Sequence, residues 1–211
     1  MNDPQHDLFP PSDFDPWADS YDRDVVENSS FPFAGYEKVI SRVVTLAEPG
    51  PGMDVLDLGT GTGNIAVRFS ASGCNLWCTD FSEAMLAKAR EKLPLAHFVL
   101  HDIRDNWPSE LDRRFARIVS GYVFHHFELE KKVSLCHDLL TNHLASAGRL
   151  IVADISFPSL AAKDEFARGI TNWEDEFYWL ADESIAALNE AGISAAHEQI
   201  SPCAGIYLMQ S

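Results

Sequence analysis

The most constraining feature of the sequence is a regular alternation between short apolar runs and segments with helical periodicity, which begins near residue 35. Strands that are apolar on both faces and separated by helices form a parallel sheet covered on both sides. The alternation therefore predicts an α/β fold with three layers. The expected strands are 53–58, 75–80, 96–102, 116–122, 149–155, 194–200 and 204–209, and the expected helices are 36–48, 63–72, 129–144, 182–191 and one capped by Ser82.

The last two expected strands are joined by a short turn at Ser201 and Pro202. A parallel crossover connection needs a dozen residues or more, whereas antiparallel strands can be joined by a tight turn. We therefore expect these two strands to be antiparallel to each other.

The composition is that of one globular domain. The chain has 211 residues, of which 46% are hydrophobic, and this is enough for a sizeable core. Sixteen Lys and Arg against 32 Asp and Glu give a formal net charge of −16, and such a surface repels phosphate backbones and anionic lipids. We therefore expect no nucleic-acid partner and no membrane partner. We also expect the protein to be a monomer or a homodimer.

The cysteines and the first residues predict a cytoplasmic location. The four cysteines form no CxxC pair, which is typical of buried, reduced thiols in a cytosolic protein. The first ten residues contain no Lys or Arg and no apolar core, so no secretory signal is expected.

Two segments do not follow the alternation. Residues 1–34 are rich in Pro and Asp, and Phe14, Trp17 and Tyr21 recur there at helical spacing. We expect residues 1–34 to form a cap on a domain of residues 35–211, either as a lid over a site or as an aromatic stripe that docks the N-terminus. The acidic, aromatic segment 164–183 forms either a wall of the substrate pocket or an amphipathic helix.

The stretch after the first expected strand is a glycine loop, with glycines at 59, 61 and 63. Alternating glycines at a strand-to-helix turn let a ligand approach the backbone closely, and ligands of open α/β sheets bind at this edge. The loop lacks the Lys of a phosphate-binding P-loop. It also differs from the dinucleotide fingerprint GxGxxG, because position 64 is Asn.

Acidic residues end the next two expected strands. Asp80 follows Gly59 by 21 residues, and a carboxylate there can accept two hydrogen bonds from a ribose diol. Asp102 can accept a hydrogen bond from an adenine amino group, while its neighbour Ile103 covers the ring. Together with the loop, these residues predict an adenosine-shaped ligand without a pyrophosphate.

With these features the sequence resembles a class I S-adenosylmethionine-dependent methyltransferase. The resemblance rests on DLGTGTG, TDFSEAMLAKAR, HDI, IVSGYVFHHF and GRLIVAD, and covers roughly residues 36–155. The segments WAxxYD and LNEAGI are similar to the small bacterial YrrT-like members of the broad UbiE-like group. The resemblance implies a Rossmann-like, seven-stranded, mostly parallel sheet with an antiparallel last strand, and S-adenosyl-L-methionine as cofactor.

The resemblance also implies roles for single residues. Asp57 and the loop residues would surround the methionine moiety, Asp80 would bind the ribose, and Asp102 would meet the adenine amino group. Tyr21 would contact the carboxylate end of the cofactor from the lid. The full set of implied cofactor-binding residues is Tyr21, Asp57, Gly59, Thr60, Gly61, Gly63, Asp80, Phe81, Met85, Asp102, Ile103, Ser120 and Gly121.

The candidate catalytic residues follow the fourth expected strand. Histidine as a residue type suits proton transfer near neutral pH, so His125 is the candidate general base, with Tyr122 as an alternative hydrogen-bond donor or pocket wall. A structural role for the pair His125 and His126 is the competing interpretation. A base is needed only for some acceptors, because a thiolate or a neutral amine attacks without one.

A metal site is not expected. His97 and His101 share one face of a strand, and Cys74 and Cys78 share a face of another, but no pair has zinc-finger spacing.

The sequence therefore predicts an S-adenosylmethionine-dependent methyltransferase that acts on a small-molecule acceptor and produces S-adenosylhomocysteine. Two alternatives remain open: a non-catalytic protein that binds either nucleoside, and an NAD(P)-dependent oxidoreductase, which the glycine spacing disfavours. Nucleic-acid methylation is disfavoured by the net charge, and the chain has Ser120-Gly-Tyr-Val in place of an Asn-Pro-Pro-Tyr element.

Overall fold

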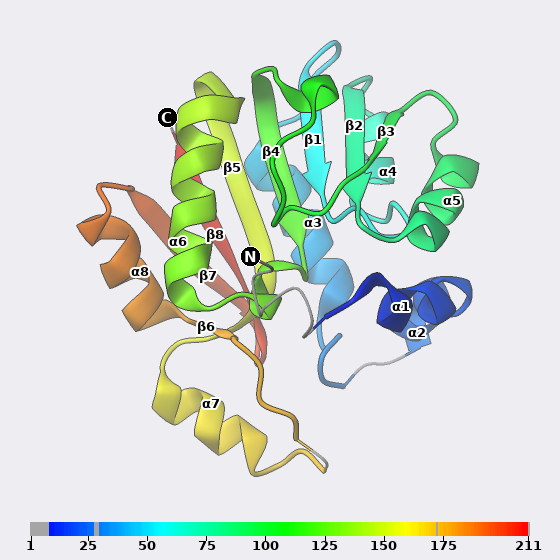
Figure 1. The fold of residues 1–211 in the computed structure, drawn as a ribbon. Coiled ribbons are helices and arrows are strands. Elements are labelled where there is room, and N and C mark those ends of the chain that lie inside the picture. Colours follow the sequence, from blue (N-terminus) through cyan, green and yellow to red (C-terminus); the bar gives the residue numbers. More distant parts are fainter. Residues whose placement is uncertain (1–8, 28–29, 172, 211) are drawn as a thin grey trace.

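The computed structural model describes residues 9–27, 30–171 and 173–210, which form one sheet with helices on both faces (Figure 1). The strand order is β3-β2-β1-β4-β5-β8-β7. Strands β1 to β5 are parallel, whereas β8 is antiparallel to both β5 and β7, as predicted. The strands are β1 (Asp54–Leu58), β2 (Asn75–Asp80), β3 (His97–Leu100), β4 (Phe115–Gly121), β5 (Leu144–Phe157), β7 (Ala195–Ser201), β8 (Ala204–Gln210) and the short β6 (Trp179–Leu180), which pairs with the end of β5.

The helices cover the two faces of the sheet because each has one apolar stripe. Helices α3 (Tyr36–Ala47), α4 (Ala66–Ser70) and α5 (Glu83–Lys92) lie on one face, and α6 (Leu129–Asp138) and α8 (Ala181–Glu190) lie on the other. In α3 the buried residues Val39, Ile40 and Val43 recur at helical spacing and pack against the sheet. The expected N-cap of α5 is confirmed, because Ser82 Oγ accepts a hydrogen bond from Met85 N at 3.1 Å.

Two predicted boundaries were wrong. The helix expected from residue 63 begins only at Ala66, because Gly63 adopts a left-handed conformation with φ +87°. The helix expected to reach residue 144 ends as α-helix at Asp138 and continues as a π-helical turn, η5 (Leu139–His143). Strand β5 then begins at Leu144, which pairs with Phe115 across a register shift.

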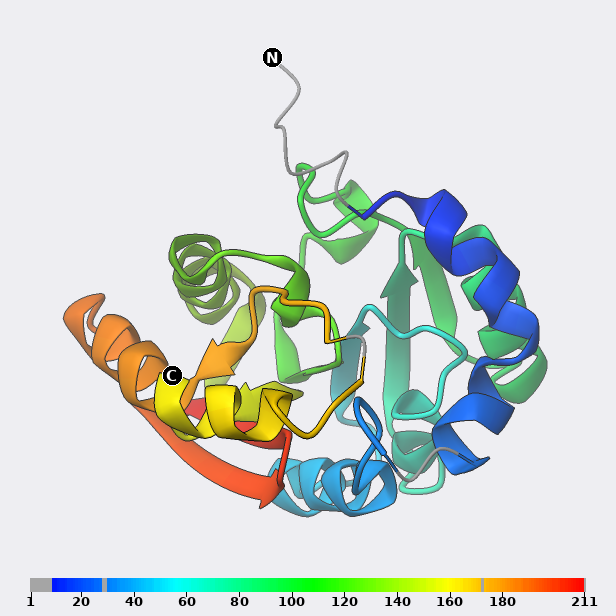
Figure 2. The same ribbon diagram turned by 90° about the horizontal axis from the view of Figure 1, so that it is seen from below.

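Two segments lie at the end of the sheet where the parallel strands finish (Figure 2). On one side are α1 (Pro11–Phe14), η2 (Asp15–Asp19) and α2 (Tyr21–Glu27). On the other side is α7 (Leu160–Ala167), followed by an irregular stretch that leads into β6. Residues 1–8 and 28–29 of the expected cap lie outside the described residues, and the division of the chain at residue 34 stays a prediction.

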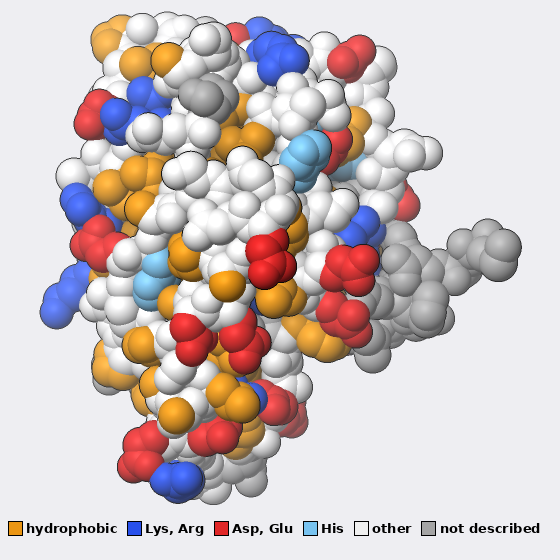
Figure 3. All heavy atoms as spheres, turned by 90° about the vertical axis from the view of Figure 1, so that its left-hand side faces the viewer, with side chains coloured by type: hydrophobic (Ala, Val, Ile, Leu, Met, Phe, Trp, Pro, Cys, Tyr) orange, Lys and Arg blue, Asp and Glu red, His pale blue; other side chains and the backbone are white. Residues whose placement is uncertain are grey.

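The surface agrees with the acidic composition. On the face that α7 and α8 present, acidic side chains gather towards the α7 end (Figure 3). Among the described residues, no helix combines the length and the apolarity that crossing a bilayer requires.

Candidate functional site

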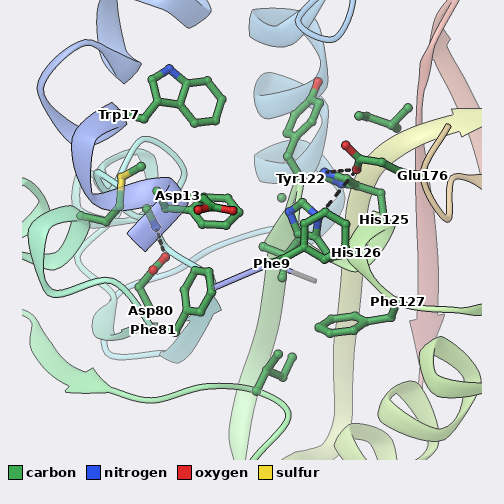
Figure 4. A pocket seen from close by; sticks show the side chains of 18 of the residues that line it. Phe9, Asp13, Trp17, Asp80, Phe81, Tyr122, His125, His126, Phe127 and Glu176 are labelled. Carbon is green, nitrogen blue, oxygen red and sulfur yellow. Dashed lines mark hydrogen bonds and ion pairs between the residues drawn. The ribbon is translucent and has the colours of Figure 1, made fainter. Parts of the chain in front are cut away.

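A cavity of about 380 Å³ lies beyond the carboxyl ends of β1, β2 and β4 (Figure 4). The glycine loop and β2 form one side of it, and the turn after β4 forms the other. Most of the predicted site residues line this cavity: Tyr21, Gly59, Gly61, Asp80, Phe81, Met85, Asp102, Ile103, Gly121, Tyr122 and His125.

The three loop glycines have different tasks. All three have positive φ, but a Cβ atom on Gly59 would lie 2.3 Å from Val123, and one on Gly63 would lie 3.3 Å from Ala89. These two glycines therefore let the loop pack closely against its neighbours. A Cβ atom on Gly61 would meet nothing within 4 Å, so this glycine leaves open space beside the cavity that it lines.

Four predicted residues lie behind the lining. Asp57 is buried, and its Oδ2 accepts a hydrogen bond from Thr60 Oγ1 at 2.8 Å, so the pair holds the loop from within. Burial raises the pKa of Asp57 from its ordinary value of 3.8 to about 7. Ser120 Oγ donates to the backbone oxygen of Leu58 at 2.8 Å and ties β4 to β1. Gly63 packs against α5.

Asp80 is held by backbone donors of the loop and of the turn after β2. Its Oδ2 accepts a hydrogen bond from Gly61 N at 2.8 Å, and its Oδ1 accepts one from Ser82 N at 2.9 Å. The two oxygens of a carboxylate offer about four lone-pair sites, so Asp80 keeps accepting capacity for a ligand beside its backbone donors, which include Phe81. Burial raises the pKa of Asp80 from 3.8 to about 6, and the backbone donors oppose this shift.

The residues expected around an adenine lie beside Asp80. Phe81, Met85 and Ile103 supply apolar surface. Asp102 forms an ion pair with Arg104, with Oδ2 and Nη2 2.5 Å apart, and the Arg104 guanidinium lies 5.8 Å from the centre of the Phe81 ring.

The N-terminal helices complete this side of the cavity. Phe14 packs on Phe81 with ring centres 5.0 Å apart, and Trp17 packs on Tyr21 at 4.8 Å. Two hydrogen bonds fasten the segment to the body at 2.6 Å each: Thr62 Oγ1 donates to Asp22 in α2, and Ser82 Oγ donates to Asp15 in η2.

His125 occupies the other side of the cavity and is held by a carboxylate. Its Nδ1 lies 2.6 Å from Oδ1 of Asp154, a fully buried residue of β5. Asp154 is fixed in turn by Trp179 Nε1, which donates to its Oδ2 at 3.1 Å. The His125 Nε2 atom lies 3.5 Å from Glu176 Oε2. Asp154 thus anchors Nδ1 of the ring, whereas Nε2 faces Glu176 and the cavity (Figure 4).

His126 and Tyr122 are half-buried, and the buried atoms His126 Nδ1 and the Tyr122 hydroxyl oxygen have no hydrogen-bond partner among the described residues. Burial lowers the pKa of His126 to about 2, with the neighbouring His125 as a second cause, so His126 is neutral. Burial raises the pKa of Tyr122 well above its ordinary value. The Tyr122 phenol therefore stays protonated and can donate a hydrogen bond but cannot serve as a base at neutral pH.

The sequence analysis missed two carboxylates of this site. Asp154 lies in the GRLIVAD stretch, where an acidic residue inside an apolar strand was the available signal. Glu176 lies in segment 164–183, which was expected to form either a pocket wall or an amphipathic helix. The structure favours the pocket wall, because Glu176 and Tyr178 line the cavity, whereas α7 overlaps this segment only at the helix's C-terminal end and has no buried residues.

Comparisons with known proteins agree with this geometry. A family model described as a methyltransferase domain matches residues 55–148. An uncharacterized methyltransferase of Geobacillus kaustophilus is 30% identical over 199 residues, which cover 88% of this chain and 89% of the relative. The DhpI-SAM-HEP complex is similar with a TM-score of 0.73 at 18% identity over 95% of each chain. Magnesium protoporphyrin IX methyltransferase from Synechocystis, with bound SAM, has a TM-score of 0.69 at 17% identity and covers 100% of this chain and 98% of that one.

The sheet order, the antiparallel β8 and the glycine loop after β1 define the fold of a class I S-adenosylmethionine-dependent methyltransferase. The chain belongs to this methyltransferase family, as two bacterial relatives show across 89% and 90% of their length.

Proposed function

We propose that the protein transfers the methyl group of S-adenosylmethionine to a small-molecule acceptor and releases S-adenosylhomocysteine. The observation that carries the proposal is the two-sided cavity, in which Gly61 and Asp80 lie on one side and His125 on the other. S-adenosylmethionine is the cofactor of the class to which the chain belongs.

The cofactor would occupy the side of the glycine loop. Asp80 would accept hydrogen bonds from the ribose, and Phe81 and Ile103 would flank the adenine beside Asp102. Gly61 leaves the space that the methionine moiety needs. Asp57, Thr60, Gly63 and Ser120 would act indirectly by keeping the loop in shape.

Residues 1–34 would act as a lid over this cofactor. Phe14, Trp17 and Tyr21 all line the cavity, and the segment is fastened through side-chain hydrogen bonds at Asp15 and Asp22. Such a lid excludes water from the methyl group, and a dry site favours a reaction that removes the sulfonium charge.

The acceptor would occupy the side of His125. Positioning in line with the methyl–sulfur bond supplies much of the rate, since effective molarities reach about 10⁵–10⁸ M. For an acceptor that must lose a proton, His125 Nε2 is placed to accept it while Asp154 holds Nδ1. Tyr122 would donate a hydrogen bond to the acceptor or to the cofactor.

A transfer assay tests the proposal directly. The protein is incubated with S-adenosylmethionine labelled in its methyl group and with a small-molecule extract of bacterial cells. We expect label to move into a small molecule as S-adenosylhomocysteine forms in equal amount. Tight cofactor binding without any transfer would support the alternative of a non-catalytic binder, and transfer to added RNA, DNA or protein alone would contradict the acceptor class.

A further inference from the structure

A cluster of His125, His126 and Glu176 lies at the acceptor side of the cavity. One potential ligand atom from each residue lies within 4.8 Å of those of the other two, and no other group of three such residues occurs in the part of the chain that the structure describes. Glu176 Oε2 is central, at 3.5 Å from His125 Nε2 and 3.7 Å from His126 Nδ1. In Figure 4 these three side chains point toward one another.

The separations fit the coordination shell of a transition metal. Metal–ligand bonds of about 2.1 Å at tetrahedral angles place neighbouring ligand atoms about 3.4 Å apart. The two measured separations are slightly longer, so a small inward movement of the side chains would complete a shell.

Two of the three ligand atoms have no hydrogen-bond partner among the described residues. These atoms are His126 Nδ1 and Glu176 Oε2, and both are buried. Buried polar atoms without a partner are uncommon in folded proteins, because leaving them unpaired costs free energy. A bound cation would satisfy both atoms at once.

The surroundings of the cluster resemble those of metal sites in which a carboxylate orients the ligating histidine. A histidine that binds a metal through one ring nitrogen usually donates from the other to a carboxylate, and His125 Nδ1 meets buried Asp154 at 2.6 Å. The segment that carries Glu176 is tied to the turn of His125, because Phe177 N donates to the His125 backbone oxygen at 3.1 Å. It is also tied to α6, because Lys132 Nζ donates to the Phe177 backbone oxygen.

We propose that His125, His126 and Glu176 form a binding site for one divalent first-row transition metal ion, with an open coordination position toward the cavity. Two imidazoles and one carboxylate suit Zn²⁺, Fe²⁺, Co²⁺ or Ni²⁺ better than Mg²⁺ or Ca²⁺, which prefer oxygen ligands alone. The sequence analysis expected no metal site, and the proposal departs from that expectation. Glu176 lies 50 residues from His126, so no ligand spacing in the sequence indicates the site.

The site would change the role of His125 under the proposed function. With Nε2 bound to an ion, His125 would be a ligand and not a base, and the ion would lower the pKa of an acceptor hydroxyl or thiol. The acceptor would then carry an oxygen or sulfur donor that can occupy the open position. This consequence rests on the proposed function, whereas the ion site itself does not.

Metal binding to the untagged, full-length protein tests the site without any assay of activity. After treatment with a chelator, the protein is titrated with Co²⁺ and followed by visible absorption, and Zn²⁺ is measured by calorimetry and by elemental analysis. We expect one ion per chain and the absorption bands of cobalt bound by nitrogen and oxygen. Absence of both signals in the wild-type protein would overturn the proposal.

Matched variants locate the ion. Glu176→Gln and His126→Ala are expected to weaken Zn²⁺ binding at least 100-fold, and Asp154→Asn to weaken it 10- to 100-fold through His125. Glu174→Gln, on an exposed residue of the same segment, and His137→Asn, on exposed α6 surface, are expected to bind as the wild type does. Equal binding by Glu176→Gln and Glu174→Gln would place any ion elsewhere and contradict the proposal.

Binding of S-adenosylhomocysteine is measured in the same variants. Retained binding in Glu176→Gln shows that the fold and the cofactor side are intact, so a loss of metal is specific. If the wild-type protein bound the metal but not the nucleoside, the metal site would stand and the proposed function would fail.

Discussion

The two sides of the cavity are built in different ways. The proposed cofactor side comes largely from one continuous stretch, in which β1, the glycine loop and β2 place Gly61 N 2.8 Å from Asp80 Oδ2. The proposed acceptor side is assembled from the turn after β4, from β5 and from the segment before β6, which contribute His125, Asp154 and Glu176. Local sequence thus determines one side, whereas tertiary packing determines the other.

This difference predicts how variants will behave. Changes on the cofactor side should affect nucleoside affinity, and changes on the acceptor side should affect turnover. A cofactor-side variant that changed only turnover, or an acceptor-side variant that changed nucleoside affinity, would contradict this division.

The largest effect is expected for Gly61→Val. The new side chain would project into open space that the cofactor needs, so nucleoside binding should fall below detection in calorimetry. Gly192→Val is the matched control, because Gly192 also has positive φ and open space beside its Cβ position but does not line the cavity. Similar thermal unfolding of the two variants with binding lost only in Gly61→Val is the expected outcome. Binding in Gly61→Val would show that the loop does not hold the cofactor.

If His125 Nε2 itself accepts the proton of the acceptor, His125→Ala is expected to reduce turnover about 10²- to 10⁴-fold, the range for loss of a proton-transfer group. If Nε2 binds a metal ion instead, the variant is expected to reduce turnover through loss of that ion. Affinity for S-adenosylhomocysteine should stay within about twofold of the wild type, because His125 lies on the acceptor side. Initial rates and calorimetry on the same preparation check both values. A fall in affinity with unchanged turnover would assign His125 to the cofactor pocket.

Asp80→Ala is expected to weaken cofactor binding by about 1.5–3 kcal/mol, the range for hydrogen bonds to a charged group. Asp54→Ala serves as the control, since Asp54 begins β1, lies outside the cavity lining and pairs with Arg113 on the surface. Unchanged affinity in Asp80→Ala would exclude the ribose role.

A separate effect concerns the pH dependence of stability, which is measured without a ligand. Because burial raises the folded-state pKa of Asp57 from 3.8 to about 7, the folded protein binds more protons than the unfolded chain between about pH 4 and pH 7. This residue therefore favours folding at low pH, and the benefit is lost as the pH rises through 7. The slope approaches about 1.4 kcal/mol per pH unit for one full proton.

Chemical denaturation of the wild type and of Asp57→Asn across this range measures the contribution. The free energy of unfolding of the wild type should fall relative to that of Asp57→Asn as the pH rises. Parallel pH profiles would show that Asp57 is ionised in the folded protein throughout.

The same division explains what the sequence could predict. The strands themselves and the residues of the glycine-loop side follow from signals that are short in range: apolar runs, glycine spacing and acids at strand ends. The position of Glu176 depends on where an irregular segment packs, and no periodicity predicts that. The π-helical turn after Asp138 was also missed, because Leu139 to His143 continue the amphipathic pattern while β5 already requires Leu144 as a strand residue.

The central claim is that the cavity lined by the glycine loop and Asp80 holds S-adenosylmethionine. Calorimetric titration of the wild-type protein with S-adenosylhomocysteine, alongside NADH, tests it most directly. The account predicts saturable binding of one S-adenosylhomocysteine per chain and none of NADH. Binding of NADH, or no heat with S-adenosylhomocysteine, would contradict it.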